Sequence, residues 1–305
     1  MTIGFIGLGA IGGPIAGRLA AHTDAVVYDI RAEATAAFQG KAAVGLSPAD
    51  VAARSDVVFG CLSTLSAYRE AIVESQGIFG GRAKVYVHLG TTGGALAREL
   101  EAALAVHGIV TIDAPITGGV ARAKDGTLTS MVSGPRAVVD RIMPALQSYS
   151  GKVVWVGEKV GAAQTMKVVN NMMSAANLAV AAECLVLGVK AGLDPDTMLE
   201  VVNAGSGQSN ATLTKLPDHI LTGGFDFGGS LAITLKDLQA FLDEASGFGI
   251  DSPIGTLVRR AYARAGADGV DGLDMTTVIR PMEQDAGVEV RRGRPWGRPQ
   301  GRPRS

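Results

Sequence analysis

The sequence contains few cysteine, histidine and aromatic residues. Its 305 residues include 2 Cys and 4 His, and Phe, Trp and Tyr together make up 5% of the chain. Cys61 and Cys184 each lie in an apolar run without CxxC spacing, which excludes a disulfide framework and predicts two reduced core residues. The histidines have no partner at metal-ligand spacing and no HExxH motif is present, so we expect no metal site.

The first residues lack the features of a secretory signal or a membrane span. No basic region precedes the first apolar residues, and glycine interrupts the segment 1–13 every few positions. Together with the unpaired cysteines, this N-terminus predicts a cytoplasmic protein without a membrane partner.

Positive and negative charges nearly cancel over the whole chain, but they are distributed unevenly along it. The formal net charge is −1, yet the last fifteen residues carry six Arg and no acid, so residues 1–290 have a charge of −7. A mildly acidic body repels phosphate backbones, so we expect no nucleic-acid partner for it. The segment 287–305 includes a repeated Gly-Arg-Pro unit, which cannot form a core and predicts a disordered tail.

Glycine, in contrast, is abundant, with 41 residues, and the chain is long enough for two domains. Up to about residue 157, short β-branched runs alternate with Ala-rich stretches, a pattern typical of a parallel sheet covered by helices on both faces. Ser47 before Pro48 has the features of a helix N-cap. The expected strands are 3–6, 26–30, 56–62, 84–89, 109–114, 129–132 and 152–156.

The strand pattern stops after Gly161, and helices are expected from there on. Residues 162–192 are apolar almost all round, which predicts one buried helix ended by Gly192 and Pro195. Further helices are expected at 195–204, 230–249 and 254–267. The sequence therefore predicts an α/β domain over 1–160 and an all-helical domain over 161–286. A helix that is apolar on every face needs more cover than one small domain supplies, so we expect a homodimer or homotetramer.

A GxGxxG motif lies between the first expected strand and helix. The first glycine permits a tight turn, the second lets backbone N–H groups approach a pyrophosphate, and the third lets the helix pack closely on the strand. In this context the motif predicts dinucleotide binding. The expected cofactor-binding residues in this loop are Gly7, Leu8, Gly9, Ala10, Ile11 and Gly12.

Asp29 ends the second expected strand, where a carboxylate can accept hydrogen bonds from an adenine ribose. Because that carboxylate repels a 2′-phosphate, Asp29 favours NAD as the cofactor over NADP. Arg31 lies two residues further on and could turn toward a 2′-phosphate, so NADP stays open as the alternative.

Two polar residues interrupt the long apolar helix near its start. Lys167 and Asn171 are four residues apart and therefore project from one face. Neither suits an apolar surrounding unless a polar group lies opposite. A lysine whose pKa is lowered by burial can take a hydroxyl proton as hydride leaves, and can return it in the reverse direction.

A strand end and Pro115 precede a second glycine-containing loop. The exposed N–H groups of Thr117, Gly118 and Gly119 can bind a substrate carboxylate, and the Thr117 hydroxyl adds a further donor.

The chain resembles the β-hydroxyacid dehydrogenases, which include 3-hydroxyisobutyrate dehydrogenase and tartronate semialdehyde reductase and, more distantly, 6-phosphogluconate dehydrogenase. Four segments carry the resemblance in the family's order, from residue 3 to about 280: GFIGLGAIGGPIAGRLA, DAPITGGVARAKDGTLTSMVSG, GAAQTMKVVNNMM and LKDLQAFLDEASGFGIDSP. It implies a Rossmann doubly wound sheet followed by an all-α domain. The implied reaction is NAD-dependent oxidation of a small β-hydroxyacid of the 3-hydroxyisobutyrate or tartronate semialdehyde class, or the reverse reduction.

The resemblance also implies roles for single residues. It makes Lys167 the general acid/base and Asn171 a substrate-orienting amide. Thr117 stands where the family usually has Ser, and Arg122 where it often has Gly. Arg122 could anchor a second anionic group or lie on the loop surface, and the surface is the expected place. The remaining expected positions are Leu62, Ser63, Thr91 and Lys236 near the cofactor, and Ser209 near the substrate.

Two other functions stay open at this point. Imine reductases share this architecture, but those that resemble the family generally lack the lysine, so Lys167 counts against that function. A non-catalytic dinucleotide-binding module is the other alternative, and members that became such modules also lost the lysine. No serine lies in a GxSxG elbow, which excludes hydrolysis by that route.

Overall fold

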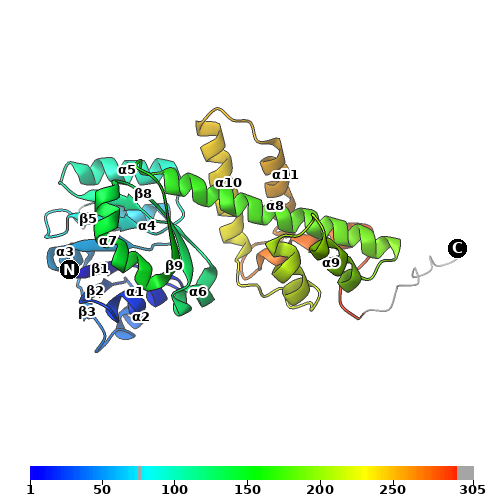
Figure 1. Cartoon of the computed structure of the whole chain (residues 1–305), viewed down its shortest axis with the longest axis horizontal. Helices are drawn as coiled ribbons and strands as arrows, with labels where there is room; N and C mark the ends of the chain where they lie inside the picture. The colour runs from blue at the N-terminus through cyan, green and yellow to red at the C-terminus, as the bar shows by residue number, and fades with distance from the viewer. Residues whose placement is uncertain (75–76, 294–305) are drawn as a thin grey trace. The chain divides into compact units, whose positions relative to one another are not determined.

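A computed structural model of the chain describes residues 1–74 and 77–293 and divides into two compact units (Figure 1). The first is Met1–Val168, which we call the nucleotide-binding unit, and the second is Val169–Ser305, which we call the helical unit. The division falls inside the long helix α8 (Ala162–Ala191), whereas the sequence places the domain boundary at 160.

The nucleotide-binding unit is built around a sheet of nine strands. They are β1 (Ile3–Ile6), β2 (Ala25–Tyr28), β3 (Ala43–Val44), β4 (Val57–Gly60), β5 (Val85–His88), β6 (Val110–Asp113), β7 (Ile116–Thr117), β8 (Leu128–Ser133) and β9 (Ser150–Gly157). The order β3-β2-β1-β4-β5-β6 is parallel throughout, which is the strand order of a dinucleotide-binding fold.

Helices cover both faces of this sheet (Figure 1). Because both faces are buried, the strands are apolar at successive positions, and the neighbours Phe5 and Ile6 belong to two different cores. Ser47 accepts a hydrogen bond from Asp50 N at 3.1 Å, which confirms the expected N-cap. The helices are α1 (Gly12–Ala20), α2 (Ala32–Ala36), α3 (Pro48–Arg54), α4 (Leu65–Tyr68), the π-helix η1 (Arg69–Val73), α5 (Gly94–Ala105), α6 (Gly119–Asp125) and α7 (Arg136–Tyr149).

All seven expected strands are present, but the sheet is not wholly parallel as the sequence pattern predicted. Strand β8 pairs antiparallel with β6 and with β7, and β9 then pairs parallel with β8. The chain turns back after β6 through the two-residue β7 and the short α6, which ends at Gly126 in the left-handed conformation with φ 72°. The short strands β3 and β7 were missed because two residues carry no periodic signal.

The helical unit packs around α8. Its other elements are α9 (Pro195–Ala204), the π-helix η2 (Ala211–Ile220), α10 (Leu231–Gly247), α11 (Pro253–Ala265), the 3-10 helix η3 (Met275–Ile279) and α12 (Arg280–Ala286). Helix α8 ends one residue before the expected stop, Gly192 has φ 102°, and Asp194 caps α9 ahead of Pro195. Buried residues of α8 such as Leu178 and Leu185 form one core with the surrounding helices.

Helix α8 is long and apolar enough to cross a membrane by length and composition alone, with a mean hydropathy of 1.7 over its best window. The core helix of a soluble protein meets the same criteria, and α8 contributes many residues to the core of the helical unit. Four of its apolar residues nevertheless lie exposed at seven-residue spacing, on one face by helical periodicity. We call them the α8 stripe: Met166, Met173, Val180 and Leu187.

Two structural expectations drawn from the sequence need correction. Val290, within the expected tail 287–305, is fully buried in the core of the helical unit, and its backbone N–H donates to Glu283 Oε1 at 2.7 Å. Arg291 forms an ion pair with the same Glu283 carboxylate, so a buried acid holds the start of this segment in place. The rest of the expected tail, 294–305, lies outside the described residues. Cys184 is exposed on α8 rather than in the core, whereas Cys61 packs against the core of the nucleotide-binding unit.

Candidate active site

Five strands of the nucleotide-binding unit end at one level of the sheet. The register pairs Ile6 with Tyr28 and Gly60, and His88 with Gly60 and Asp113. Loops that follow the carboxyl ends of parallel strands meet at one edge, which is where such sheets bind their ligands. The expected cofactor residues of the Gly7–Gly12 loop, Asp29, Leu62, Ser63 and Thr91 all lie in these loops.

The fold itself requires two of the three motif glycines, and the third leaves space beside the loop. Gly7 has φ 97°, a conformation that side chains rarely adopt, and a Cβ on Gly12 would collide with the carbonyl oxygen of Gly7. A Cβ on Gly9 would meet nothing within 4 Å. The middle of the loop therefore faces open space in front of the N-terminus of α1, where backbone N–H groups can bind a pyrophosphate.

Asp29 connects the end of β2 to this loop. Its Oδ2 accepts a hydrogen bond from Leu8 N at 2.7 Å, and its Oδ1 accepts from Arg31 N at 2.9 Å. Arg31 Nε also lies 3.0 Å from Asp29 Oδ1. Burial opposes ionisation of Asp29, but the hydrogen bonds from Arg31 and Leu8 outweigh it and hold the pKa of this carboxyl below its usual value. Arg31 therefore neutralises Asp29 and is turned toward it.

A buried tyrosine fixes the loop that follows β4. Leu62 N donates to the Tyr68 hydroxyl at 2.9 Å, and that hydroxyl donates to Gly60 O at 3.3 Å. Ser63, the next residue, is exposed. Tyr68 thereby holds the backbone of an expected adenosine-side loop without itself reaching the surface.

The expected carboxylate-binding loop contains β7 and the start of α6. Gly118 and Gly119 have φ values of 135° and 75° and are exposed, while Thr117 is half-buried. This backbone leaves successive N–H groups accessible, as an anion-binding turn requires. Arg122 is exposed on α6, the surface location that the sequence led us to expect.

A buried carboxylate anchors the first turn of α8. Asp113, at the end of β6, accepts hydrogen bonds on Oδ2 from Gly161 N at 3.3 Å and from Gln164 N at 3.1 Å. Its Oδ1 accepts from Gln164 Nε2 at 2.7 Å. Burial raises the pKa of Asp113 to about 7, and these hydrogen bonds act against that rise.

Gln164 joins three segments through its side-chain amide. Besides Asp113, its Nε2 donates to Gly90 O at 2.8 Å, while its Oε1 accepts from Thr92 N at 2.9 Å and Gly93 N at 3.2 Å. Both donors and both acceptor positions of the amide are thus used, which fixes its orientation. This Asp113–Gln164 network holds the loop that carries Thr91 against the start of α8.

Lys167 follows Gln164 by three residues on α8, close to one helical turn. It is buried, as the sequence predicted, with 8% of its surface exposed. It belongs to the nucleotide-binding unit, together with the glycine loop and Thr117–Gly119. Its backbone position is therefore set by the Asp113–Gln164 network rather than by a flexible loop.

Asn171 lies one turn beyond Lys167 and is held within the helical unit. Its Nδ2 donates to Asp237 Oδ2 at 2.6 Å, and its Oδ1 accepts from Asn170 Nδ2 at 3.3 Å. Lys236 Nζ lies 3.0 Å from Asp237 Oδ1, and Lys236 is exposed whereas Asp237 is buried. The Lys-Asp pair on α10 therefore contacts the expected substrate-orienting amide through its aspartate.

Ser209 lies just before η2. Its backbone N–H donates to Thr212 Oγ1 at 2.9 Å, and Thr212 N donates back to Ser209 Oγ at 3.4 Å. The residue is half-buried. Its hydroxyl thus has a local structural role at the start of η2.

Comparisons with known proteins show to which family the chain belongs. A family model described as the NAD binding domain of 6-phosphogluconate dehydrogenase matches residues 2–157, and one described as NAD-binding of NADP-dependent 3-hydroxyisobutyrate dehydrogenase matches 161–282. The 2-(hydroxymethyl)glutarate dehydrogenase of Eubacterium barkeri is 33% identical over 297 residues, covering 96% of this chain and 98% of that protein. The chain belongs to the 3-hydroxyisobutyrate dehydrogenase family.

Solved structures agree with this assignment. Mycobacterium tuberculosis 3-hydroxyisobutyrate dehydrogenase with L-serine has a TM-score of 0.83 at 30% identity, covering 92% of this chain and 98% of that one. A Streptomyces aurantiacus imine reductase has a TM-score of 0.61 at 21% identity, covering 92% and 99%, which shows a shared fold only. This member of the family is accordingly an NAD(P)-dependent oxidoreductase with a Rossmann domain followed by a helical domain.

Sequence reasoning missed the two residues of this family member that fix the start of α8. Asp113 and Gln164 both lie in segments that carry the family resemblance, but the resemblance implies no role for either residue. A signal was present: an acid at the end of an apolar strand and an amide in the first turn of an apolar helix both need buried partners. That they are each other's partners depends on the sheet order, which the sequence does not show.

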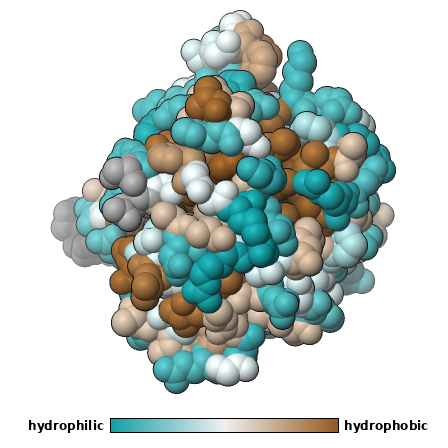
Figure 2. All heavy atoms as spheres, turned by 90° about the vertical axis from the view of Figure 1, so that its left-hand side faces the viewer, coloured by the Kyte–Doolittle hydropathy of each residue, from teal (hydrophilic) through white to brown (hydrophobic). Residues whose placement is uncertain are grey.

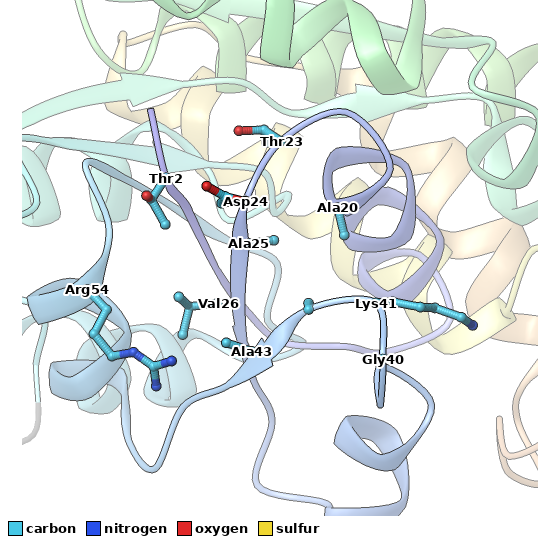
Figure 3. Close-up of a pocket in the computed structure, with 11 residues that line it drawn as sticks. Thr2, Ala20, Thr23, Asp24, Ala25, Val26, Gly40, Lys41, Ala43 and Arg54 are labelled. Carbon is cyan, nitrogen blue, oxygen red and sulfur yellow. The ribbon is translucent and has the colours of Figure 1, made fainter.

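A hollow of about 550 Å³ lies elsewhere in the nucleotide-binding unit (Figure 3). Thr2, Ala25 and Ala43, which line it, stand at the amino ends of β1, β2 and β3. Ligands of this family's sheet bind at the opposite, carboxyl ends. The hollow is therefore separate from the loops described above.

Proposed function

We propose that the chain oxidises a small β-hydroxyacid of the 3-hydroxyisobutyrate or tartronate semialdehyde class with NAD, or catalyses the reverse reduction, and that Lys167 is the general acid/base. One observation carries the proposal: a buried lysine follows the Asp113–Gln164 network by one turn, in the same unit as the glycine loop. A buried lysine in a fixed position is suited to proton transfer with a bound substrate.

The residues present fit NAD. The open space at Gly9, the conformation of Gly7 and the Asp29 carboxylate provide for a pyrophosphate and an adenine ribose. NAD, when bound, supplies the acceptor for hydride. Gly7–Gly12 and Asp29 would hold it, with Leu62, Ser63, Thr91 and Lys236 as further expected contacts.

The chain's own residues bind the hydroxyacid and move its proton. Thr117 and the N–H groups of Gly118 and Gly119 bind the carboxylate, and the Asn171 amide orients the substrate. Lys167 Nζ, in its neutral form, takes the hydroxyl proton as the C–H bond is broken. In the reverse direction the ammonium form returns this proton to the carbonyl oxygen.

We infer that NAD is preferred over NADP. The Asp29 carboxylate disfavours a 2′-phosphate, and Arg31, the cation that could bind that phosphate, is paired with Asp29. Use of NADP would require Arg31 to leave this partner.

Lys167→Ala is the direct test. A general acid/base typically contributes about 10²- to 10⁴-fold, so we expect kcat to fall by that range while NADH binding, followed by fluorescence, stays unchanged. A folded Lys167→Ala protein that binds NADH and keeps more than a tenth of wild-type turnover would disprove the assignment. Turnover of a cyclic imine in place of hydroxyacids would instead favour imine reduction.

We also propose a homodimer or homotetramer in the cytosol. The α8 stripe supports self-association, because Met173, Val180 and Leu187 are 61%, 55% and 70% exposed. A second copy of the chain can cover a continuous apolar helix face that the helical unit leaves open. A cytosolic location is supported by two free cysteines in the described residues, one of them exposed on α8.

A further inference from the structure

A fully buried histidine at the end of β5 has no role so far. The Nε2 atom of His88 lies 2.8 Å from Thr92 Oγ1, and its Nδ1 atom lies 3.1 Å from the Tyr86 hydroxyl. Burial lowers the pKa of His88 to about 3, so the imidazole is neutral at ordinary pH. A neutral imidazole has one donor and one acceptor, and here each ring nitrogen has a partner.

The hydrogen bonds of these three side chains run in one direction. Among the described residues, the buried Tyr86 hydroxyl has no hydrogen-bond partner besides His88, so it donates its proton to Nδ1. The ring proton is therefore on Nε2, which donates to Thr92 Oγ1. The Thr92 hydroxyl in turn donates to Gly93 O at 3.5 Å. His88 thus holds the Thr92 side chain from the strand.

Thr92 belongs to the loop that follows β5, and Gln164 holds the backbone of the same loop. Thr92 N donates to Gln164 Oε1 at 2.9 Å, and Gln164 Nε2 donates to Gly90 O at 2.8 Å. Thr91, which is half-buried, lies between these two attachment points. Its position therefore depends on Gln164 through the backbone and on His88 through the side chain of the next residue.

Tyr68 packs against the same histidine and the same loop. The rings of Tyr68 and His88 have centroids 4.4 Å apart, and a Cβ on Gly90 would collide with the Tyr68 hydroxyl. This hydroxyl also accepts from Leu62 N in the loop after the neighbouring strand β4. All these residues belong to the nucleotide-binding unit, so their contacts are internal to one compact unit.

The strand order indicates which end of a dinucleotide this loop meets. The glycine loop follows β1 and Asp29 follows β2, whereas β5 lies on the other side of β1, two strands or about 10 Å away. With the pyrophosphate at the glycine loop and the adenine ribose at Asp29, the nicotinamide half extends away from β2, in the direction of β5.

We propose that His88 is a positioning residue for the nicotinamide end of the cofactor, because it fixes, through Thr92, the loop that carries Thr91. This inference rests on the cofactor role proposed above for Thr91 and adds His88 and Thr92 to it. Burying an imidazole in an otherwise apolar strand carries a desolvation cost. The hydrogen bond to Thr92 offsets that cost and uses it to order the loop.

The test compares the affinities of NADH and of ADP-ribose, which lacks the nicotinamide, by calorimetry. The amide nitrogen of Gln can replace Nε2 of a histidine and that of Asn can replace Nδ1, so His88→Gln keeps a donor for Thr92 and His88→Asn does not. We expect His88→Asn to weaken NADH binding by at least about fivefold, the effect of one hydrogen bond, and to leave ADP-ribose within about twofold. His88→Gln should stay within about twofold for both ligands.

A second pair of variants leaves the buried ring in place. Thr92→Val removes the hydroxyl that accepts from His88, and Thr92→Ser keeps it, so Val should lose NADH affinity and Ser should not. His22→Asn, at an exposed histidine of the same unit, is the matched control and should change neither affinity.

Two results would overturn the inference: an equal loss for NADH and ADP-ribose in His88→Asn and Thr92→Val, or an unchanged NADH affinity in both. These affinities need no turnover. A His88-dependent preference for NADH in a protein that oxidises no hydroxyacid would support the inference and reject the proposed function. Oxidation of hydroxyacids by a protein without that preference would support the proposed function and reject the inference.

Discussion

The two units of the chain position their polar residues in different ways. In the nucleotide-binding unit, the expected residues follow strands that end in register, so one sheet edge brings loops from five strands together. In the helical unit, Asn171, Ser209 and Lys236 come from α8, from the segment before η2 and from α10, and packing alone relates them. In the sheet, one hydrogen-bonding register fixes where neighbouring strands end. In the helical unit, each contact between two helices depends on the side chains at that contact.

The buried charges of the two units show the same difference. Asp113 accepts three hydrogen bonds from the start of α8, whereas Lys215 has a single hydrogen-bond partner, Ser174. A buried group with several hydrogen-bond partners fixes the structure around it more firmly than a buried group with one partner does. The comparison assigns Asp113 a positioning role at the start of α8. On the face of the nucleotide-binding unit seen in Figure 2, polar and apolar residues are interspersed in small patches, unlike the α8 stripe.

Gln164→Leu should have the largest effect on stability. It would leave Gly90 O, Thr92 N, Gly93 N and one Asp113 oxygen without their buried partner, and each such group costs about 1–3 kcal/mol. We expect the free energy of unfolding, measured with urea, to fall by about 4 kcal/mol and kcat to fall at least tenfold. Gln239→Leu, which removes an amide with an exposed hydrogen bond on α10, is the control. A similar small loss in both variants would show that the network does not position Lys167.

Asp113→Asn should change how stability depends on pH. Burial raises the pKa of Asp113 to about 7 from an ordinary value of 3.8, so the folded chain holds this proton more tightly than the unfolded chain. The resulting stabilisation is complete below about pH 4 and is lost as the pH rises through 7. We expect the stability advantage of wild type over Asp113→Asn to shrink by about 3 kcal/mol between pH 4 and 8. Urea unfolding across that range would contradict this if the difference were constant.

Much of this arrangement could be predicted from the sequence, for physical reasons that differ between residues. Gly7, Gly9 and Asp29 belong to a local strand–turn–helix unit, so their spacing alone carries the prediction. Helix α8 was predicted almost to the residue because Gly192 and Pro195 stop it. Asp113 with Gln164 and Lys215 with Ser174 could not be paired, because these contacts join segments 51 and 41 residues apart. The antiparallel β8 was missed for the same reason: strand direction depends on the path of β7 and α6 rather than on composition.

Asp29→Ala should change cofactor choice by a moderate factor. The substitution removes the carboxylate that disfavours a 2′-phosphate and releases Arg31 from its ion pair. We expect the ratio of kcat/KM for NAD to that for NADP to fall about tenfold, which corresponds to about 1.4 kcal/mol. Asp24→Ala, an exposed aspartate just before β2, should leave the ratio unchanged. An unchanged ratio in Asp29→Ala would place the determinant of cofactor choice elsewhere.

Leu187→Glu should affect the fold least. Because Leu187 is 70% exposed on α8, a charge there leaves the free energy of unfolding of the single chain within about 0.5 kcal/mol. In an assembly that buries the α8 stripe, the same charge would lose its hydration without gaining a partner, so the assembly should dissociate. Light scattering coupled to size-exclusion chromatography would measure this. Val201→Glu, at an apolar residue 68% exposed on α9, supplies the control. Dissociation by Val201→Glu instead would move the interface to α9, and a monomeric wild type would mean that the stripe has no second copy to cover it.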